Sequence, residues 1–212
     1  MEDVLQVYAR PYHAKRPVVC IDETSKELHA SPHESLPAKP GQLARQDYEY
    51  QRNGTANLFL QVEPLTGKRR VRVTERRTSL DFAEQLRQMV EEDYPDVERV
   101  VLVTDNLNTH TPACLYARFA PEHAQRIAGK IEWHYTPEHG SWLNMAEIEL
   151  SVLSRQCLKR RLPDQARFIQ EVEAWEQARN AEQVTIDWQF KAEEARIKLK
   201  RLYPLLHKQS ST

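Results

Sequence analysis

The sequence predicts an α/β fold, a mixed five-stranded sheet flanked by helices, with a C-terminal helical tail. Two observations lead to this prediction. Five short segments are rich in apolar and β-branched residues, as buried strands are; they cover residues 16–22, 56–63, 68–74, 99–105 and 131–135. From residue 79 onwards, segments of helical periodicity alternate with the strands and then continue alone. A chain of 212 residues is long enough for one domain with a sizeable core.

The first three strands are expected to come in succession, with the second and third paired. Residues 1–12 are the end of a helix or a connector, closed by Pro11. Residues 25–47 contain several prolines and little periodicity, so we expect a loop there. Residues 64–67, Pro-Leu-Thr-Gly, have the composition of a turn, which favours pairing of the strands on either side.

Helices and strands alternate in the second half of the chain. The expected helices cover residues 79–93, 111–129, 144–159, 164–181 and 191–202. Ser79 is the expected N-cap of the first helix, and Pro121 can interrupt the second. The expected division is a connector over 1–15, a core domain over 16–162, and a helical extension over 163–212 packed on that domain.

Composition excludes several classes of protein. Thirty basic and 31 acidic residues give a net charge of -1, so only a local patch could indicate a nucleic-acid partner. No apolar run approaches the roughly 20 residues of a membrane span, and the N-terminus does not resemble a signal peptide. Three widely spaced cysteines rule out a disulfide scaffold or a thiolate zinc site. We therefore expect a cytoplasmic protein without a membrane partner.

Two of the predicted strands end in an aspartate, Asp22 and Asp105. In open α/β sheets, ligands bind beyond the carboxyl ends of the strands. A carboxylate at such a position is held rigidly and is partly desolvated, which suits coordination of a hard cation such as Mg²⁺. For one such aspartate, capping of the next helix is an equally good explanation. Two on separate strands, together with an acid on a later helix, favour a metal site.

The third acid follows from helix geometry. At about 100° per residue, Glu147 lies on a polar arc of the 144–159 helix together with Asn144 and Ser151. Glu149 points more than half a turn away, so the two glutamates cannot face one site. Taken alone, Glu147 would be interpreted as a solvated surface residue. With the two aspartates, it predicts a site for two divalent ions that promote in-line phosphoryl transfer.

Three segments that carry these acids resemble the DDE transposases of bacterial insertion sequences, in the branch related to mariner elements. They are VVCIDET (18–24), VLVTDNLNTH (101–110) and HYTPEHGSWLNMAEIE (134–149). The first aspartate of the family matches Asp22, and its Asp-Asn motif followed by a histidine matches Asp105 and His110. The family's third acid matches Glu147, although Met-Ala stands where mariner relatives often have Pro-Ile. The resemblance extends over residues 16–204 and implies an RNase H-like fold.

This resemblance implies catalytic acids and metal ligands at Asp22, Asp105 and Glu147, with Mg²⁺ or Mn²⁺ as the cofactor. It implies cleavage of double-stranded DNA at transposon ends, followed by attack of the freed 3′ hydroxyl on target DNA, at TA dinucleotides. Family members act as dimers or higher assemblies on DNA, in association with the nucleoid. Their N-terminal helix-turn-helix region has no counterpart in this chain, so end recognition is expected to be weak here or to reside in a separately encoded chain.

Further residues are candidates for DNA contacts. Trp142 could stack on an unpaired base, although core packing is the more frequent role of such a tryptophan. A basic cluster on the third strand could contact phosphates or simply be a solvated strand face. His110 could contact the scissile phosphate or be a bystander to a helix cap. The candidates are His110, Trp142, Asn144, Arg155, Lys159, Arg69 and Arg70.

Two rival functions stay open on the sequence alone. One is another RNase H-like nuclease, such as a ribonuclease H or a structure-selective nuclease. The other is an inactive or domesticated transposase remnant that acts as a DNA-binding or regulatory protein. Retention of all three acids argues against the remnant.

Overall fold

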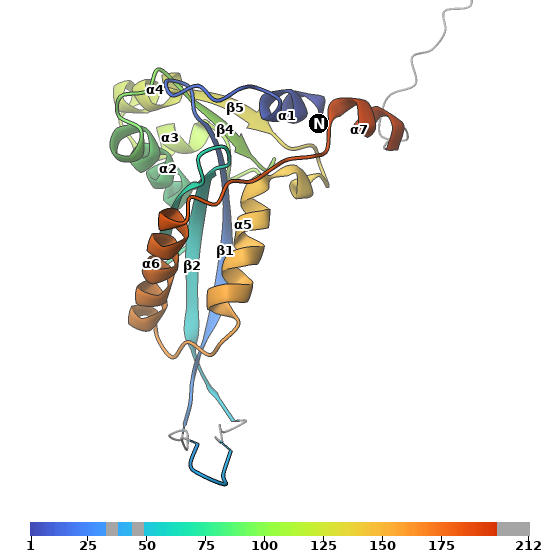
Figure 1. Ribbon diagram of the computed structural model, residues 1–212. Coiled ribbons are helices and arrows are strands. Elements are labelled where there is room, and N and C mark those ends of the chain that lie inside the picture. The colour runs from blue at the N-terminus through green and yellow to red at the C-terminus, as the bar shows by residue number, and fades with distance from the viewer. Residues whose placement is uncertain (33–37, 44–48, 199–212) are drawn as a thin grey trace, which may run out of the picture.

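The computed structural model describes residues 1–32, 38–43 and 49–198. Its centre is a five-stranded mixed sheet with the strand order β3-β2-β1-β4-β5 (Figure 1). The strands are β1 (Val18–Ala30), β2 (Gln51–Glu63), β3 (Lys68–Thr74), β4 (Val100–Thr104) and β5 (Ile131–Tyr135). Pairing is antiparallel from β3 to β1 and parallel from β1 to β5. The predicted fold class is therefore confirmed.

Helices cover both faces of this sheet. They are α1 (Glu2–Tyr8), α2 (Ser79–Gln88), α3 (Ala113–Arg118), α4 (Pro121–Gly129), α5 (Met145–Leu153), α6 (Gln165–Ala181) and α7 (Ala192–Lys198). The sequence predicts one helix over 111–129, and the structure divides it at Pro121, which begins α4. The cap of α2 is Thr78, not Ser79, because Thr78 forms a capping box with Asp81. Within the described residues, every helix is too short or too polar to span a membrane.

Strand periodicity divides the core into two parts. Val19 and Ile21 of β1 pack with α2, α3 and α4 on one face of the sheet. Cys20, between them, belongs to the opposite core, which contains residues of α1, α5 and α6. Side chains alternate between faces along a strand, so Asp22 shares the face of Cys20 and points to the side of α5.

Strands β1 and β2 are longer than predicted. Residues 25–30, expected in a loop, belong to β1, and β2 begins at Gln51 and not at residue 56. These extra residues pair with one another as far as Ala30 and Gln51, with a bulge between Glu27 and His29. Figure 1 shows the two strands continuing as a ribbon beyond the rest of the sheet. The residues of the ribbon are mostly polar and exposed, so no apolar alternation marks them as strand. The remainder of the predicted loop lies largely outside the described residues.

The chain after α6 packs against the turn between β2 and β3. The Ile186 amide donates a hydrogen bond to the carbonyl of Pro64 (2.9 Å). Gly67 of this turn has φ +73°, and a Cβ there would lie 2.7 Å from the carbonyl oxygen of Val184. Both the backbone conformation and the close approach therefore require glycine. Part of the last predicted helix, residues 199–202, lies outside the described residues.

Replacement of Gly67 by alanine is expected to destabilise the fold by more than about 2 kcal/mol, because left-handed strain of about 1–2 kcal/mol adds to a backbone clash. Chemical denaturation measures this loss. Gly54→Ala is the matched control, since Gly54 has φ +85° and a Cβ added there would meet nothing within 4 Å, so that only the strain applies. Equal losses for the two variants would contradict the close packing at the turn.

Candidate functional site

Asp22 and Asp105 come together through the pairing of β1 with β4. The parallel ladder pairs Val18 with Val101 and ends with Cys20 opposite Val103. Continuing the same register by two residues places Asp22 opposite Asp105, and neighbouring strands lie about 4.8 Å apart. Asp22 is 9 % exposed, and Asp105 follows the last residue of β4 with its side chain 18 % exposed. The two aspartates therefore lie side by side on neighbouring central strands, at the point where β4 ends. The pairing agrees with the prediction, but β1 continues past Asp22 to Ala30, so the predicted end of the first strand at Asp22 is wrong.

The start of α5 is tied directly to β1. Asn144 is the N-cap of this helix, and its side-chain oxygen accepts a hydrogen bond from the Ala146 amide (3.1 Å). Its amide group donates to the carbonyl of Ile21 (2.9 Å), the residue before Asp22. Glu147, half-buried, lies in the first turn of α5, where the helix dipole favours a negative charge. Asn144 itself is fully buried and is a structural cap, so the DNA contact predicted for it is not supported.

The carboxylates of the three acids influence one another. The pKa of Asp22 is raised to about 7, first by burial and then by the negative charges of Asp105, Glu23 and Glu147. A hydrogen bond from the Glu23 amide to Asp22 Oδ1 (2.8 Å) opposes this rise only in part. Negative charge thus accumulates around one buried carboxylate.

The donor set fits a divalent cation in its chemistry. Carboxylate oxygens are the ligands that Mg²⁺ and Mn²⁺ prefer, and a cation would offset both the burial and the neighbouring negative charges that raise the pKa of Asp22. A complete coordination geometry is not preassembled: within the described parts of the chain, no three His, Cys, Asp or Glu side chains are already arranged to hold a metal.

His110 lies between two carboxylates. Its Nδ1 contacts Asp105 Oδ1 at short range, and its Nε2 lies 3.0 Å from Glu23 Oε2. Burial alone would lower the pKa of this imidazole, but the hydrogen bonds to Asp105 and Glu23 outweigh burial and raise the pKa to about 9. His110 is only 1 % exposed, so the DNA contact predicted for its ring is not supported. Glu23 is not among the residues predicted from the sequence, although its position directly after Asp22 is a signal that could have found it.

The second glutamate of α5 has a structural role. Glu149 accepts hydrogen bonds from Arg69 of β3 (2.6 and 3.0 Å) and from Arg179 of α6 (2.9 Å). Burial alone would raise the pKa of Glu149, but the two arginines outweigh it and lower the pKa. Arg69 also donates to backbone carbonyls of Gly67 and Val184. The Arg69 side chain is 0 % exposed and joins β3, α5 and α6 inside the protein, so the DNA contact predicted for it is not supported.

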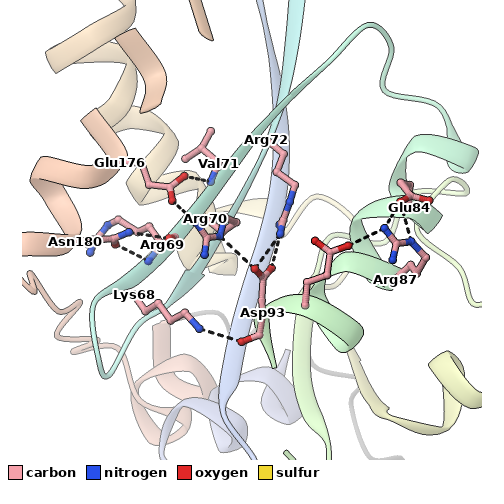
Figure 2. Close-up of polar contacts among 11 residues, drawn as sticks. Lys68, Arg69, Arg70, Val71, Arg72, Glu84, Arg87, Asp93, Glu176 and Asn180 are labelled. Atoms are coloured by element: carbon pink, nitrogen blue, oxygen red, sulfur yellow. Dashed lines mark hydrogen bonds and ion pairs between the residues drawn. The ribbon is translucent and has the colours of Figure 1, made fainter. Parts of the chain in front are cut away.

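The other cations of β3 are also occupied by internal partners (Figure 2). Arg70 pairs with Asp93 (3.2 Å) and Glu176 (2.9 Å), and Arg72 makes two hydrogen bonds of 2.9 Å to Asp93. Lys68 donates to the backbone carbonyl of Asp93 (3.1 Å). Arg70 is partly exposed, but its charge is matched by acids, so the DNA contact predicted for it is not supported.

Three residues predicted to contact DNA are exposed on the surface near the two ends of α5. Trp142, just before the helix, is 45 % exposed and packs edge-on against Phe190 with ring centroids 5.6 Å apart. Arg155 and Lys159 are exposed beyond the C-terminal end of α5, and Arg155 donates to the Ser151 hydroxyl (2.8 Å). For these three residues, DNA contact stays a prediction.

Replacing Asp22 by asparagine is expected to stabilise the metal-free protein above about pH 7. Because its folded pKa is raised, native Asp22 retains a proton between about pH 4 and 7 that the unfolded chain has released. Wild-type stability therefore falls as pH rises through this window, and the variant escapes a penalty of roughly 1–3 kcal/mol. Thermal melts in a chelator, across pH, measure the difference. Asp96→Asn, at an exposed position, is the control; a loss of stability in Asp22→Asn at high pH would contradict the mutual repulsion.

Arg69→Ala is expected to cost about 3–5 kcal/mol, because it leaves Glu149 buried with one of its two arginines. Arg70→Ala, next to it on the same strand, removes a partly exposed pair and is expected to cost about 1 kcal/mol or less. Urea denaturation compares the two variants. Similar losses would show that the Arg69–Glu149 pair is not the internal connection described above.

Comparison with known proteins gives the family. Residues 17–169 match the family described as DDE superfamily endonuclease. Among solved structures, the chain is similar to the Mos1 strand transfer complex, with 17% identity, a TM-score of 0.56, and coverage of 85% of this chain and 53% of that one. The Mos1 mariner paired end complex with Mn gives 17% identity and a TM-score of 0.52, covering 82% and 52%. No match was found among curated proteins.

At this identity the structural likeness bears on the fold alone, and the chain spans about half the length of the Mos1 chains. The shared fold agrees with the five-stranded mixed sheet flanked by helices. The family match covers most of the chain and includes the strands and the helix that carry the three acids. The chain therefore belongs to the DDE superfamily endonuclease family.

Proposed function

We propose that this chain is the catalytic domain of a transposase, which cleaves transposon-end DNA and joins the freed 3′ end to target DNA. The observation that supports the proposal is the strand register that places Asp22 opposite Asp105, together with the hydrogen bond from Asn144 to Ile21 that ties the first turn of α5, which carries Glu147, to the same part of β1. Family membership supports DNA-strand cleavage as the reaction class.

Asp22, Asp105 and Glu147 are proposed to hold divalent cations, Mg²⁺ or Mn²⁺. When bound, such ions activate an attacking oxygen and stabilise a leaving one in phosphoryl transfer. Related solved complexes of Mos1 contain Mn or Mg, which supports a divalent cofactor here. The three acids come from three separate elements, β1, the end of β4, and α5, so their spacing depends on the packing of those elements.

The residues around the acids are proposed to position the site. Asn144 holds the first turn of α5 against β1 at Ile21, which sets the distance of Glu147 from Asp22. Burial of Asp22 in a region of low dielectric strengthens its attraction to a cation. Trp142, Arg155 and Lys159 are proposed to contact DNA beside the site, through base stacking and phosphate contacts.

The proposed partners are double-stranded DNA at the transposon ends and at the target, with insertion at TA dinucleotides. Joining two ends requires two active sites, so a homodimer or higher assembly on DNA is proposed. The Mos1 neighbours are paired end and strand transfer complexes, which supports this arrangement. Recognition of specific ends is assigned to a helix-turn-helix region, either on the same polypeptide or separately encoded, and the complex is proposed to act in the cytoplasm on nucleoid DNA.

A plasmid-nicking assay with the purified chain tests the proposal. We expect Mg²⁺- or Mn²⁺-dependent nicking that a chelator abolishes. Asp22→Asn, Asp105→Asn and Glu147→Gln are each expected to lower the rate at least about 100-fold, because each removes a charge that holds the cations, worth several kcal/mol. DNA affinity should change much less.

Two exposed acids outside the site provide controls: Asp96→Asn and Glu173→Gln are expected to retain wild-type nicking. A duplex carrying the element's ends and an RNA–DNA hybrid should be offered side by side. Preference for the hybrid would contradict the transposase proposal and favour a ribonuclease. Unchanged nicking by Asp105→Asn would contradict the catalytic role of Asp105.

A further inference from the structure

A line of polar contacts leads from Asp105, through His110, to Glu23. His110 Nδ1 contacts Asp105 Oδ1, and its Nε2 lies 3.0 Å from Glu23 Oε2 on the opposite side of the ring. Glu23 belongs to β1, whereas Asp105 and His110 belong to the segment after β4. The imidazole therefore connects the segment that carries the second acid to the strand that carries the first.

The His110 ring is held firmly in place. It is 1 % exposed, and its face packs against the Phe82 ring of α2 with centroids 4.2 Å apart. The Thr104 hydroxyl, at the end of β4, lies 3.2 Å from Nδ1. A ring packed in this way has little freedom to rotate, so any carboxylate that it contacts is fixed relative to α2 and the sheet.

Asp105 needs such a support because strand pairing does not extend to it. The β4 strand ends at Thr104, and residues 105–112 form no regular helix or strand. The backbone therefore leaves the direction of the Asp105 carboxylate weakly determined. Contact of His110 with Oδ1 fixes one oxygen and leaves the second to turn toward Asp22.

Glu23 is suited to anchor this ring. It follows Asp22 on β1, and strand alternation turns it to the opposite face of the sheet, away from the α5 side to which Asp22 points. Its side chain is 7 % exposed, and Glu23 Oε2 has no partner of good hydrogen-bond geometry within the described residues, which leaves the ion pair with His110 as its compensation. Burying a carboxylate next to the acid site costs free energy unless the carboxylate is paired. The contact with His110 offsets this cost for Glu23.

We propose that His110 is a positioning residue for Asp105, with Glu23 as its anchor on β1, so that this pair sets the cation affinity of the site. The inference rests on the proposed function, because it assigns a role toward the same acids. Histidine–carboxylate contacts of this kind, next to a metal ligand, typically change metal affinity or activity by about 10- to 100-fold when removed.

Mn²⁺ binding to the full chain, measured by calorimetry without DNA, tests the proposal. His110→Ala is expected to weaken Mn²⁺ binding by about 10- to 100-fold. His110→Asn retains an amide near the position of Nδ1, so it should keep contact with Asp105 and lose less. Glu23→Gln, close in shape to the native residue, should weaken binding in the wild-type background and have little further effect beside His110→Ala, because Glu23 acts through the histidine.

A second glutamate–histidine pair on the same strand is the matched control. Glu27 and His29 of β1 are paired at 2.9 Å away from the acids. Glu27→Gln should leave Mn²⁺ affinity unchanged. Nicking at saturating Mn²⁺ should recover largely in Glu23→Gln, with DNA affinity unaltered, because the defect lies in cation binding; a general loss of structure would not be rescued in this way.

The outcomes separate the inference from the proposed function. Wild-type Mn²⁺ affinity in both Glu23→Gln and a folded His110→Ala variant, alongside loss of binding in Asp105→Asn, overturns the positioning role and leaves the proposed function intact. Equal effects of Glu23→Gln with and without His110 also overturn it, because the anchor would then act independently. If the wild-type chain neither binds Mn²⁺ nor nicks DNA, both the positioning role of His110 and the proposed function are contradicted.

Discussion

The parallel pairing of β1 with β4 is the constraint on which the site depends. This short ladder sets the register that brings Asp22 and Asp105, more than 80 residues apart in sequence, side by side where β4 ends. A shift by one residue would turn one aspartate to the opposite face. Asn144 adds a third element, because its hydrogen bond to Ile21 joins the start of α5 to β1 beside Asp22.

The acid site brings together carboxylates of like charge, which is electrostatically unfavourable. Burial, and then the negative charges of the neighbouring carboxylates, raise the pKa of Asp22. The two cores on the faces of the sheet, and the internal link from Arg69 through Glu149 to Arg179, hold the elements in place despite the repulsion. Acids kept together at this cost in free energy agree with the proposed cation site.

The sequence predicts the order of the elements and the three acids because both depend on local patterns: apolar strands end in aspartate, and helical spacing distinguishes Glu147 from Glu149. It does not reveal partners distant in the chain. Arg69 resembles a surface cation, yet Glu149, 80 residues away, draws it into the interior. The ribbon of β1 and β2 lacks apolar alternation because its residues are mostly polar, with those of β2 exposed and those of β1 mostly half-buried, so its sequence predicts a loop.

The most direct test of the account is anomalous diffraction from crystals of this chain soaked in Mn²⁺. We expect an anomalous peak between the carboxylates of Asp22 and Asp105, within reach of Glu147. Peaks only elsewhere on the molecule, with the side chains of the three acids turned apart, would contradict the claim that these elements build one cation site.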